Sequence, residues 1–218
     1  MTAIKRTLKY YFSVEGETEK WYLDWLREAI NRAPAATHKV SIVCKKKNPV
    51  SFAKSLSVLT PTEVTDLFDY ESDDDVHSER FRRRLDGLKR ASNLGKQIRF
   101  SLGYSNFTFE LWIILHKVDC NTLLTHRRNY CHYINRAFDE SFENLAQYKH
   151  EASFRRVLGK LSIDDVVAAI ERAKAINERN EQNALVLQQY KGYRYYRENP
   201  SLSVWVTIEK ILKDCHLI

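Results

Sequence analysis

Two hydrophobic patterns alternate along the first half of the chain. Short apolar runs rich in aromatic and β-branched residues are typical of buried strands, and apolar positions that recur every three or four residues are typical of amphipathic helices. Strands are expected at 7–15, 38–45, 63–71 and 96–105. Helices are expected between them at 18–33, 48–59 and 77–95, followed by a largely buried helix at 107–118. Strands that alternate with helices favour a parallel sheet with right-handed crossovers.

The second half of the chain shows helical patterns and no clear strand pattern. The segment 162–182 begins with Ser162 in the N-cap position and carries apolar residues at helical spacing. A closing helix is expected at 199–215, entered through Pro200. We therefore predict an α/β fold, with a parallel sheet of about four strands flanked by helices at residues 1–118 and a helical extension packed on it at residues 119–218.

Composition narrows the class of protein. The 218 residues are 44% hydrophobic, which is enough for a full core. No apolar run approaches the ~20 residues of a membrane span, and the first residues lack the apolar core of a secretory signal. We expect a cytoplasmic protein without a membrane partner. Four scattered cysteines argue against a zinc site or a disulfide framework. The net charge of +7 is compatible with nucleic-acid binding.

Carboxylates follow two of the expected strands. Glu15 follows the first strand and Glu19 lies one turn into the next helix, while Asp69 and Glu71 lie at the end of the third. Parallel strands end at one edge of a sheet, where the ligands of open α/β sheets bind. Clustered carboxylates need a cation, and hard oxygen donors without His or Cys indicate Mg²⁺ or Mn²⁺.

Further acidic residues follow in the stretch "ESDDD". Asp73 and Asp75 could form the second acidic motif in place of Glu71, or they could belong to a solvated loop.

The end of the fourth strand contributes another group of candidates. Ser105 and Asn106 close this strand, and Glu110 lies one turn into the following helix. Glu110 is flanked by "FTF" and "LWIIL", so it is expected to be buried and to need a partner. We interpret it as a metal ligand or an orienting group in preference to an ordinary charge at a helix N-terminus. His116, at the end of the apolar helix, is a further candidate, although a histidine in such a position is more often a packing residue.

Basic residues lie near the same edge of the predicted sheet. Lys45, Lys46 and Lys47 follow the second strand and are predicted to contact the phosphates of nucleic acid. The run "RRR" at 82–84 lies on an expected exposed helix and is interpreted as solvated surface. The aromatic run "YKGYRYYR" at 190–197 could stack on bases or pack against the core.

Four segments resemble, in order and spacing, motifs of the RloB family of Toprim-domain proteins, over nearly the whole chain. They are "VEGETEKWY" at 14–22, the acidic pair of "DYE" at 69–71, "SNFTFELWIILH" at 105–116 and "NPSLSVW" at 199–205. The resemblance implies a Toprim sheet with one glutamate after the first strand and an Asp-x-Asp pair after a later strand. The chain departs from the family pattern in having Glu71 in place of the second aspartate and Phe107 where proline is usual.

The same resemblance implies roles for individual residues. Glu15 would be the Toprim glutamate, acting as general acid/base or metal ligand, and Glu19 the second glutamate of the "EGxTE" form. Asp69 and Glu71 would be the acidic pair.

The function that the resemblance implies is a Mg²⁺- or Mn²⁺-dependent nuclease acting on RNA such as tRNA, or on DNA. Such a protein would be the effector of an anti-phage defence system, with an ABC- or AAA-type ATPase encoded alongside. The chain has no glycine-rich phosphate loop, so it is not expected to hydrolyse ATP itself. The alternative is a non-catalytic adaptor that binds nucleic acid or the ATPase through a degenerate site. The presence of Glu15 and Asp69 favours the enzyme.

Overall fold

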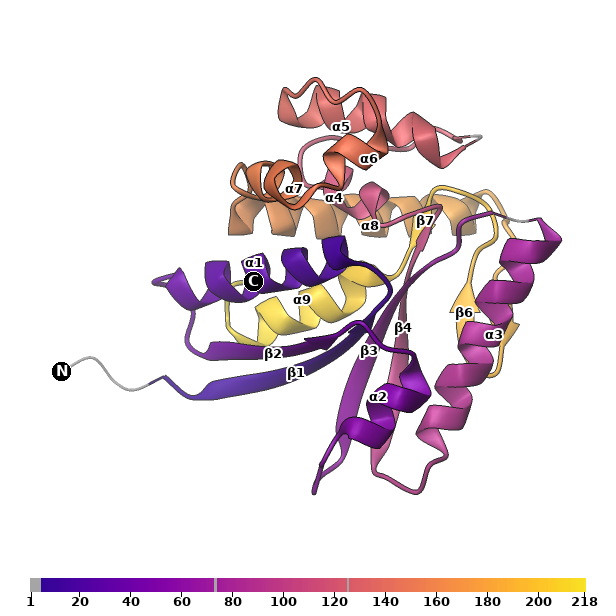
Figure 1. The fold of residues 1–218 in the computed structure, drawn as a ribbon. Helices are drawn as coiled ribbons and strands as arrows, with labels where there is room; N and C mark the ends of the chain where they lie inside the picture. Colours follow the sequence, from indigo (N-terminus) through magenta and orange to yellow (C-terminus); the bar gives the residue numbers. More distant parts are fainter. Residues whose placement is uncertain (1–4, 73, 125) are drawn as a thin grey trace.

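A five-stranded, mostly parallel sheet forms the centre of the molecule. The computed structural model describes residues 5–72, 74–124 and 126–218. The strand order is β2-β1-β3-β4-β7, with the first four strands parallel and β7 antiparallel to β4 (Figure 1). The strands are β1 (Thr7–Val14), β2 (Lys39–Lys45), β3 (Thr62–Asp69), β4 (Ile98–Asn106) and β7 (Ser201–Leu202). The predicted parallel sheet flanked by helices is confirmed.

Helices cover both faces of this sheet (Figure 1). Helices α1 (Glu17–Arg32) and α9 (Val204–Asp214) pack on one face, in a core that includes Leu26 and Ile208. On the other face lie α2 (Pro49–Ser55), α3 (Asp75–Ser92) and the hairpin of β5 (Gln188–Tyr190) and β6 (Tyr193–Tyr195). This second core includes Phe81, Leu85 and Tyr195.

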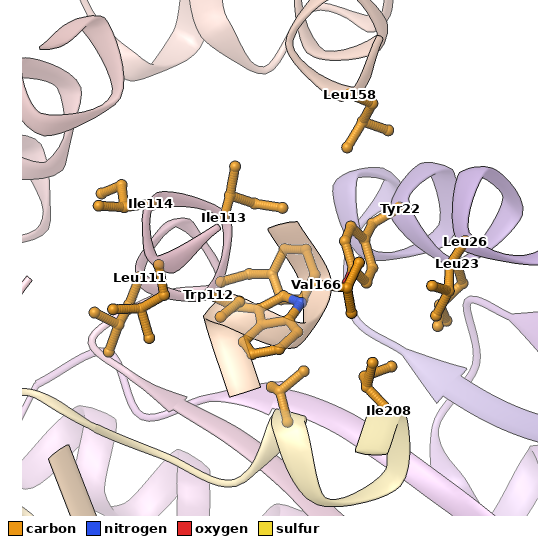
Figure 2. Packing of buried hydrophobic residues seen from close by; sticks show 14 of the residues in the cluster. Tyr22, Leu23, Leu26, Leu111, Trp112, Ile113, Ile114, Leu158, Val166 and Ile208 are labelled. Atoms are coloured by element: carbon orange, nitrogen blue, oxygen red, sulfur yellow. The ribbon is translucent and has the colours of Figure 1, made fainter. Parts of the chain in front are cut away.

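The second half of the chain is mostly helical, as predicted. Its elements are α4 (Glu110–Leu115), the 3₁₀ helix η1 (Arg127–Asn129), α5 (Tyr130–Phe138), α6 (Leu145–Tyr148), α7 (Glu151–Leu158) and α8 (Ile163–Gln182). Trp112 of α4 is fully buried and lies among Tyr22 of α1, Val166 of α8 and Ile208 of α9 (Figure 2). The division at residue 118 stays a prediction, but one continuous core includes residues from both sides of it.

Four details differ from the sequence patterns. The helix expected at 199–215 covers only Val204–Asp214, because Ser201 and Leu202 pair with β4 as strand β7. Strands β5, β6 and β7 were not predicted, because two or three residues are too few to show an alternating pattern. The helix expected at 107–118 is shorter, since only Glu110–Leu115 is helical. Helix α3 begins at Asp75 rather than at residue 77, because the side chain of Asp74 accepts a hydrogen bond from the His77 amide and caps the helix.

None of the described helices combines the length and the apolar character that crossing a bilayer demands.

Candidate active site

Four of the predicted carboxylates line one cleft. Glu15 follows β1 directly, Glu19 lies in the first turn of α1, Asp69 ends β3 and Glu71 lies two residues beyond it. The cleft has a volume of about 340 Å³, and its wall also includes Thr108, Arg127 and Lys149. We call it the carboxylate pocket. The parallel order of β1 and β3 places their ends side by side, which is why residues so distant in sequence meet here.

The inner part of the site is a group of carboxylates around one lysine. The side chains of Glu19 and Glu110 are nearly inaccessible, at 4% and 1% exposure. Lys149, which follows α6, places its Nζ 3.0 Å from Glu110 Oε1 as an ion pair, while neither carboxylate oxygen of Glu110 has a hydrogen-bond partner among the described residues. Thr18 Oγ1 donates to Glu19 Oε2 at 2.9 Å. Glu110 is thus buried and partnered, as its apolar flanks indicated.

The electrostatics of this inner group favour the binding of positive charge. Burial raises the pKa of Glu19 and, more strongly, that of Asp69, and the carboxylate of Glu110 raises both further. Burial lowers the pKa of Lys149, but the negative charges of Glu110, Asp69 and Glu19 together outweigh that effect, so the net shift of the pKa is upward. One ammonium group faces three carboxyl groups, so a proton or a cation that enters the pocket relieves their repulsion.

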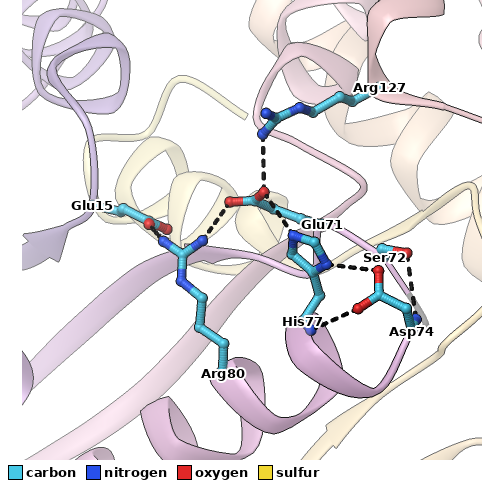
Figure 3. Close-up of polar contacts among 7 residues, drawn as sticks. All are labelled: Glu15, Glu71, Ser72, Asp74, His77, Arg80 and Arg127. Carbon is cyan, nitrogen blue, oxygen red and sulfur yellow. Dashed lines mark hydrogen bonds and ion pairs between the residues drawn. The ribbon is translucent and has the colours of Figure 1, made fainter.

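The outer part of the site is held by two arginines (Figure 3). Arg80 of α3 lies between Glu15 and Glu71: its Nη2 donates to Glu15 Oε1, and its Nη1 donates to Glu71 Oε1 at 2.8 Å. Arg127 Nη1 donates to Glu71 Oε2 at 2.9 Å. Both oxygens of Glu71 are therefore engaged by guanidinium groups. His77 Nε2 lies 3.6 Å from Glu71 Oε2.

The types of donor atom in this site suit Mg²⁺ or Mn²⁺, but the present positions of the side chains do not form a metal-binding arrangement. The donors are all carboxylate oxygens, which hard divalent cations prefer, and Glu110 Oε2 has free capacity. Across residues 5–72, 74–124 and 126–218, however, no three His, Cys, Asp or Glu side chains are arranged to hold a metal ion. The predicted convergence on one pocket is present, but arginine and lysine groups neutralise the carboxylates there.

A second cleft of about 430 Å³ shares Glu15 with the carboxylate pocket and has Arg80 in its wall. We call it the basic cleft. Its basic lining residues are Lys46, Lys47, Arg80, Arg83, Arg84 and Arg90. Two of the three predicted phosphate-binding lysines therefore share one cavity, while Lys45 is exposed at the end of β2 and does not line it.

The family assignment follows from a comparison over nearly the whole chain. The family model described as RloB-like protein matches residues 10–211. The chain belongs to the RloB-like family. No curated protein and no solved structure matches it. The match spans every carboxylate of the pocket, so the resemblance inferred from four short motifs is confirmed.

Several predicted residues of this RloB-like chain lie outside the carboxylate pocket. Ser105 and Asn106 are buried at the end of β4, where Asn106 Nδ2 donates to the Arg197 carbonyl at 2.6 Å. Asp75 is exposed in the first turn of α3 and does not line the pocket. Asp73, the other half of the rival acidic pair, lies outside the described residues.

His116 is a packing residue in this RloB-like structure. It is buried, and because a carbonyl only accepts, its Nδ1 donates to the Trp112 carbonyl at 2.9 Å. Its Nε2 then accepts from the Tyr22 hydroxyl at 3.1 Å. Burial lowers the pKa of His116 to about 4, so the ring is neutral near pH 7. It does not line the carboxylate pocket.

One residue of the run at 82–84 has a role that the sequence interpretation missed. Arg84 is 13% exposed and donates from Nε and Nη2 to the two oxygens of the fully buried Asp66, at 2.7 and 2.6 Å. Asp66 also accepts from Ser13 Oγ. The interpretation of Arg84 as solvated surface is therefore wrong. Its spacing from Phe81 and Leu88, which are buried on the same helix, was the available signal.

The aromatic run at 190–197 packs against the core in part. Tyr195 and Tyr196 are buried, and the hydroxyl of Tyr190 donates to Asp86 of α3. These contacts favour packing over base stacking for the buried tyrosines.

Proposed function

We propose that this RloB-like chain is a Mg²⁺- or Mn²⁺-dependent nuclease that hydrolyses phosphodiester bonds in RNA or DNA. The observation that carries the proposal is the pairing of two adjacent clefts. Five carboxylates line one of them, six basic side chains line the other, Glu15 lines both, and Arg80 of the basic cleft donates to Glu15. Carboxylates suit a hard divalent cation, and clustered lysines and arginines suit the phosphates of a nucleic-acid backbone.

The residues have distinct roles in this proposal. Glu15, Glu19, Asp69 and Glu71 would hold the cation, which when bound would polarise the phosphodiester and lower the pKa of a water. Glu15 is partly exposed on the boundary between the two clefts, where it can reach a bound strand and move a proton. Glu110 is not on the pocket wall, and it would act by holding Lys149 in place.

The test is a cleavage assay on total RNA and on plasmid DNA with Mg²⁺ or Mn²⁺. Glu15→Gln and Asp69→Asn keep the shape of each side chain, and each should lower the cleavage rate by about 100-fold or more. Glu28→Gln is the matched control, because Glu28 lies on the exposed part of α1 and pairs with Arg32. It should cleave like the unchanged protein. Cleavage at the full rate by both site variants would overturn the nuclease proposal.

A specific observation supports the adaptor as second candidate. Both oxygens of Glu71 accept from arginines, and this residue replaces the aspartate of the family pattern. An adaptor would bind nucleic acid or an ATPase, and it would not cleave nucleic acid in the presence of either Mg²⁺ or Mn²⁺. If the protein binds a nucleic-acid strand but cleaves none under any of these conditions, the adaptor function is the correct one.

The cellular setting is part of the proposal and is supported by the family motifs. We propose a cytoplasmic effector of anti-phage defence that acts with an ABC- or AAA-type ATPase encoded alongside. Co-expression of both proteins should protect cells from phage, and Asp69→Asn should abolish protection without lowering protein abundance. Full protection by the variant would contradict an enzymatic effector.

A further inference from the structure

Arg80 forms part of the wall of the basic cleft and also holds two residues of the carboxylate pocket. We propose that the basic cleft binds a phosphate of a nucleic-acid strand, and that this phosphate draws Arg80 away from Glu15 and Glu71. Phosphate binding in one cleft thereby makes the carboxylates of the other available to a divalent cation. The inference rests on the proposed function in taking nucleic acid as the ligand. It goes further in assigning the control of cation binding to one side chain, that of Arg80.

The composition of the basic cleft suits an anion. Among the described residues that line it, Glu15 is the only acidic one. Arg84 is held by Asp66, Arg83 by Glu79 and Lys46 by Glu17. Lys47 and Arg90, by contrast, form no ion pair with any residue of the described ranges. The volume of about 430 Å³ has room for a nucleotide unit, since small-molecule sites span roughly 300–1,000 Å³.

The position of Arg80 allows it to change partners. Its side chain extends from α3 to lie between Glu15 and Glu71 (Figure 3) and is 47% exposed. Its partners Glu15 and Glu71 are 28% and 17% exposed, so water reaches these ion pairs mainly from the arginine side, and ion pairs that water reaches are weakened. The guanidinium carbon also lies 5.5 Å from the centroid of the Phe68 ring, and Phe68 lines the basic cleft. Arg80 can therefore turn into that cleft by side-chain rotation, without movement of α3.

Charge supplies the coupling between the two clefts. A phosphate competes well for a guanidinium group because it accepts two parallel hydrogen bonds. Once Arg80 leaves, Glu15 loses its arginine partner and Glu71 keeps only Arg127, so the negative potential of the carboxylate pocket rises. A cation then binds more tightly. The linkage is reciprocal, so a bound cation also frees Arg80 for the phosphate.

The first experiment measures strand binding in EDTA, where cleavage does not interfere. The probe is a short fluorescein-labelled single strand, supplied as RNA or as DNA of the same sequence. Lys47→Ala/Arg90→Ala should weaken binding by about 10-fold, a difference of about 1.4 kcal/mol. Arg82→Ala/Lys89→Ala removes the same charge from exposed positions of α3 outside the cleft, and it should weaken binding by less than about 3-fold. The RNA and DNA arms identify the preferred source of the phosphate. Equal losses in the two double variants, with either strand, would overturn the cleft as the binding site.

The second experiment measures Mn²⁺ affinity by calorimetry, with and without a phosphorothioate strand that resists cleavage. Without the strand, Arg80→Gln should bind Mn²⁺ about 5–10-fold more tightly than the unchanged protein, within the usual range of coupling between sites. The strand should tighten Mn²⁺ binding to the unchanged protein by a similar factor and leave Arg80→Gln unaffected. Arg82→Gln, on the same helix, should behave like the unchanged protein.

Equal Mn²⁺ affinities for Arg80→Gln and the unchanged protein, or an equal effect of the strand on both, would overturn the coupling. These results are separable from cleavage. A chain that passes both binding tests and never cuts would retain this inference and lose the nuclease proposal, and a chain that cuts but fails them would do the reverse.

Discussion

Arg84 balances the charge of Asp66, a carboxylate that water cannot reach. Asp66 is fully buried within β3, and its carboxylate accepts two hydrogen bonds from this guanidinium group. Arg84→Ala would leave that charge without compensation, so we expect the free energy of unfolding to fall by about 3–5 kcal/mol. Arg83→Ala is the neighbouring control: its partner Glu79 is exposed, and the loss should stay below about 1 kcal/mol. Urea denaturation measures both, and similar losses would contradict the structural role of Arg84.

His116 makes stability depend on pH. Burial lowers its pKa in the folded protein from 6.5 to about 4. At pH values between these two pKa values, the unfolded chain binds a proton at His116 that the folded chain does not bind. The stability that neutral His116 contributes is therefore fully present above pH 6.5 and is lost as the pH falls towards 4. Between pH 7 and pH 5 the loss should be about 2 kcal/mol.

His116→Gln should lose this part of the pH dependence, and urea denaturation of both proteins at the two pH values isolates it from the carboxyl groups. An unchanged difference between the two pH values in the variant would show that His116 titrates normally.

At the scale of single elements, α8 begins where its local sequence specifies. Ser162 Oγ accepts from the Asp165 amide at 3.2 Å, and the Asp165 side chain accepts from the Ser162 amide at 2.8 Å, which together form a capping box. Ser162→Ala removes one acceptor and should cost about 1 kcal/mol of stability. Ser162→Thr keeps the acceptor and should cost only a few tenths. Chemical denaturation distinguishes them, and equal costs would mean that the cap is not the cause.

At the scale of the whole molecule, the larger core joins segments from both halves of the chain. Phe12 of β1, Leu26 of α1 and Trp112 of α4 belong to the same buried cluster as Val166 and Ile208. A fragment of residues 1–118 would lose α8 and α9 and expose one face of the sheet to water. We expect this fragment not to fold cooperatively, because the burial that offsets chain entropy is absent. Circular dichroism during urea denaturation measures this. A sharp transition in the fragment would instead support an independent domain ending at 118.

Local pattern alone was enough to locate most of the fold. The bounds predicted for the strands and for α1, α2 and α8 agree with the structure to within a few residues, because apolar spacing depends only on neighbouring residues. The same holds for the carboxylates: strands that run parallel end at one edge, so Glu15, Glu19 and Asp69 meet wherever the order of elements is correct. The order of the elements and the spacing of the apolar residues are properties of the sequence itself.

Tertiary structure alone decided which charges became partners. Arg80 reaches Glu15 across 65 residues, and Lys149 reaches Glu110 from the loop after α6. No local pattern marks either contact, because an ion pair depends on where two separate elements approach each other. The burial of Arg84 against Asp66 and the addition of β7 to the edge of the sheet arise in the same way. Sequence placed the carboxylates at one edge of the sheet, and packing of α3 and the helical half placed arginine and lysine groups against them.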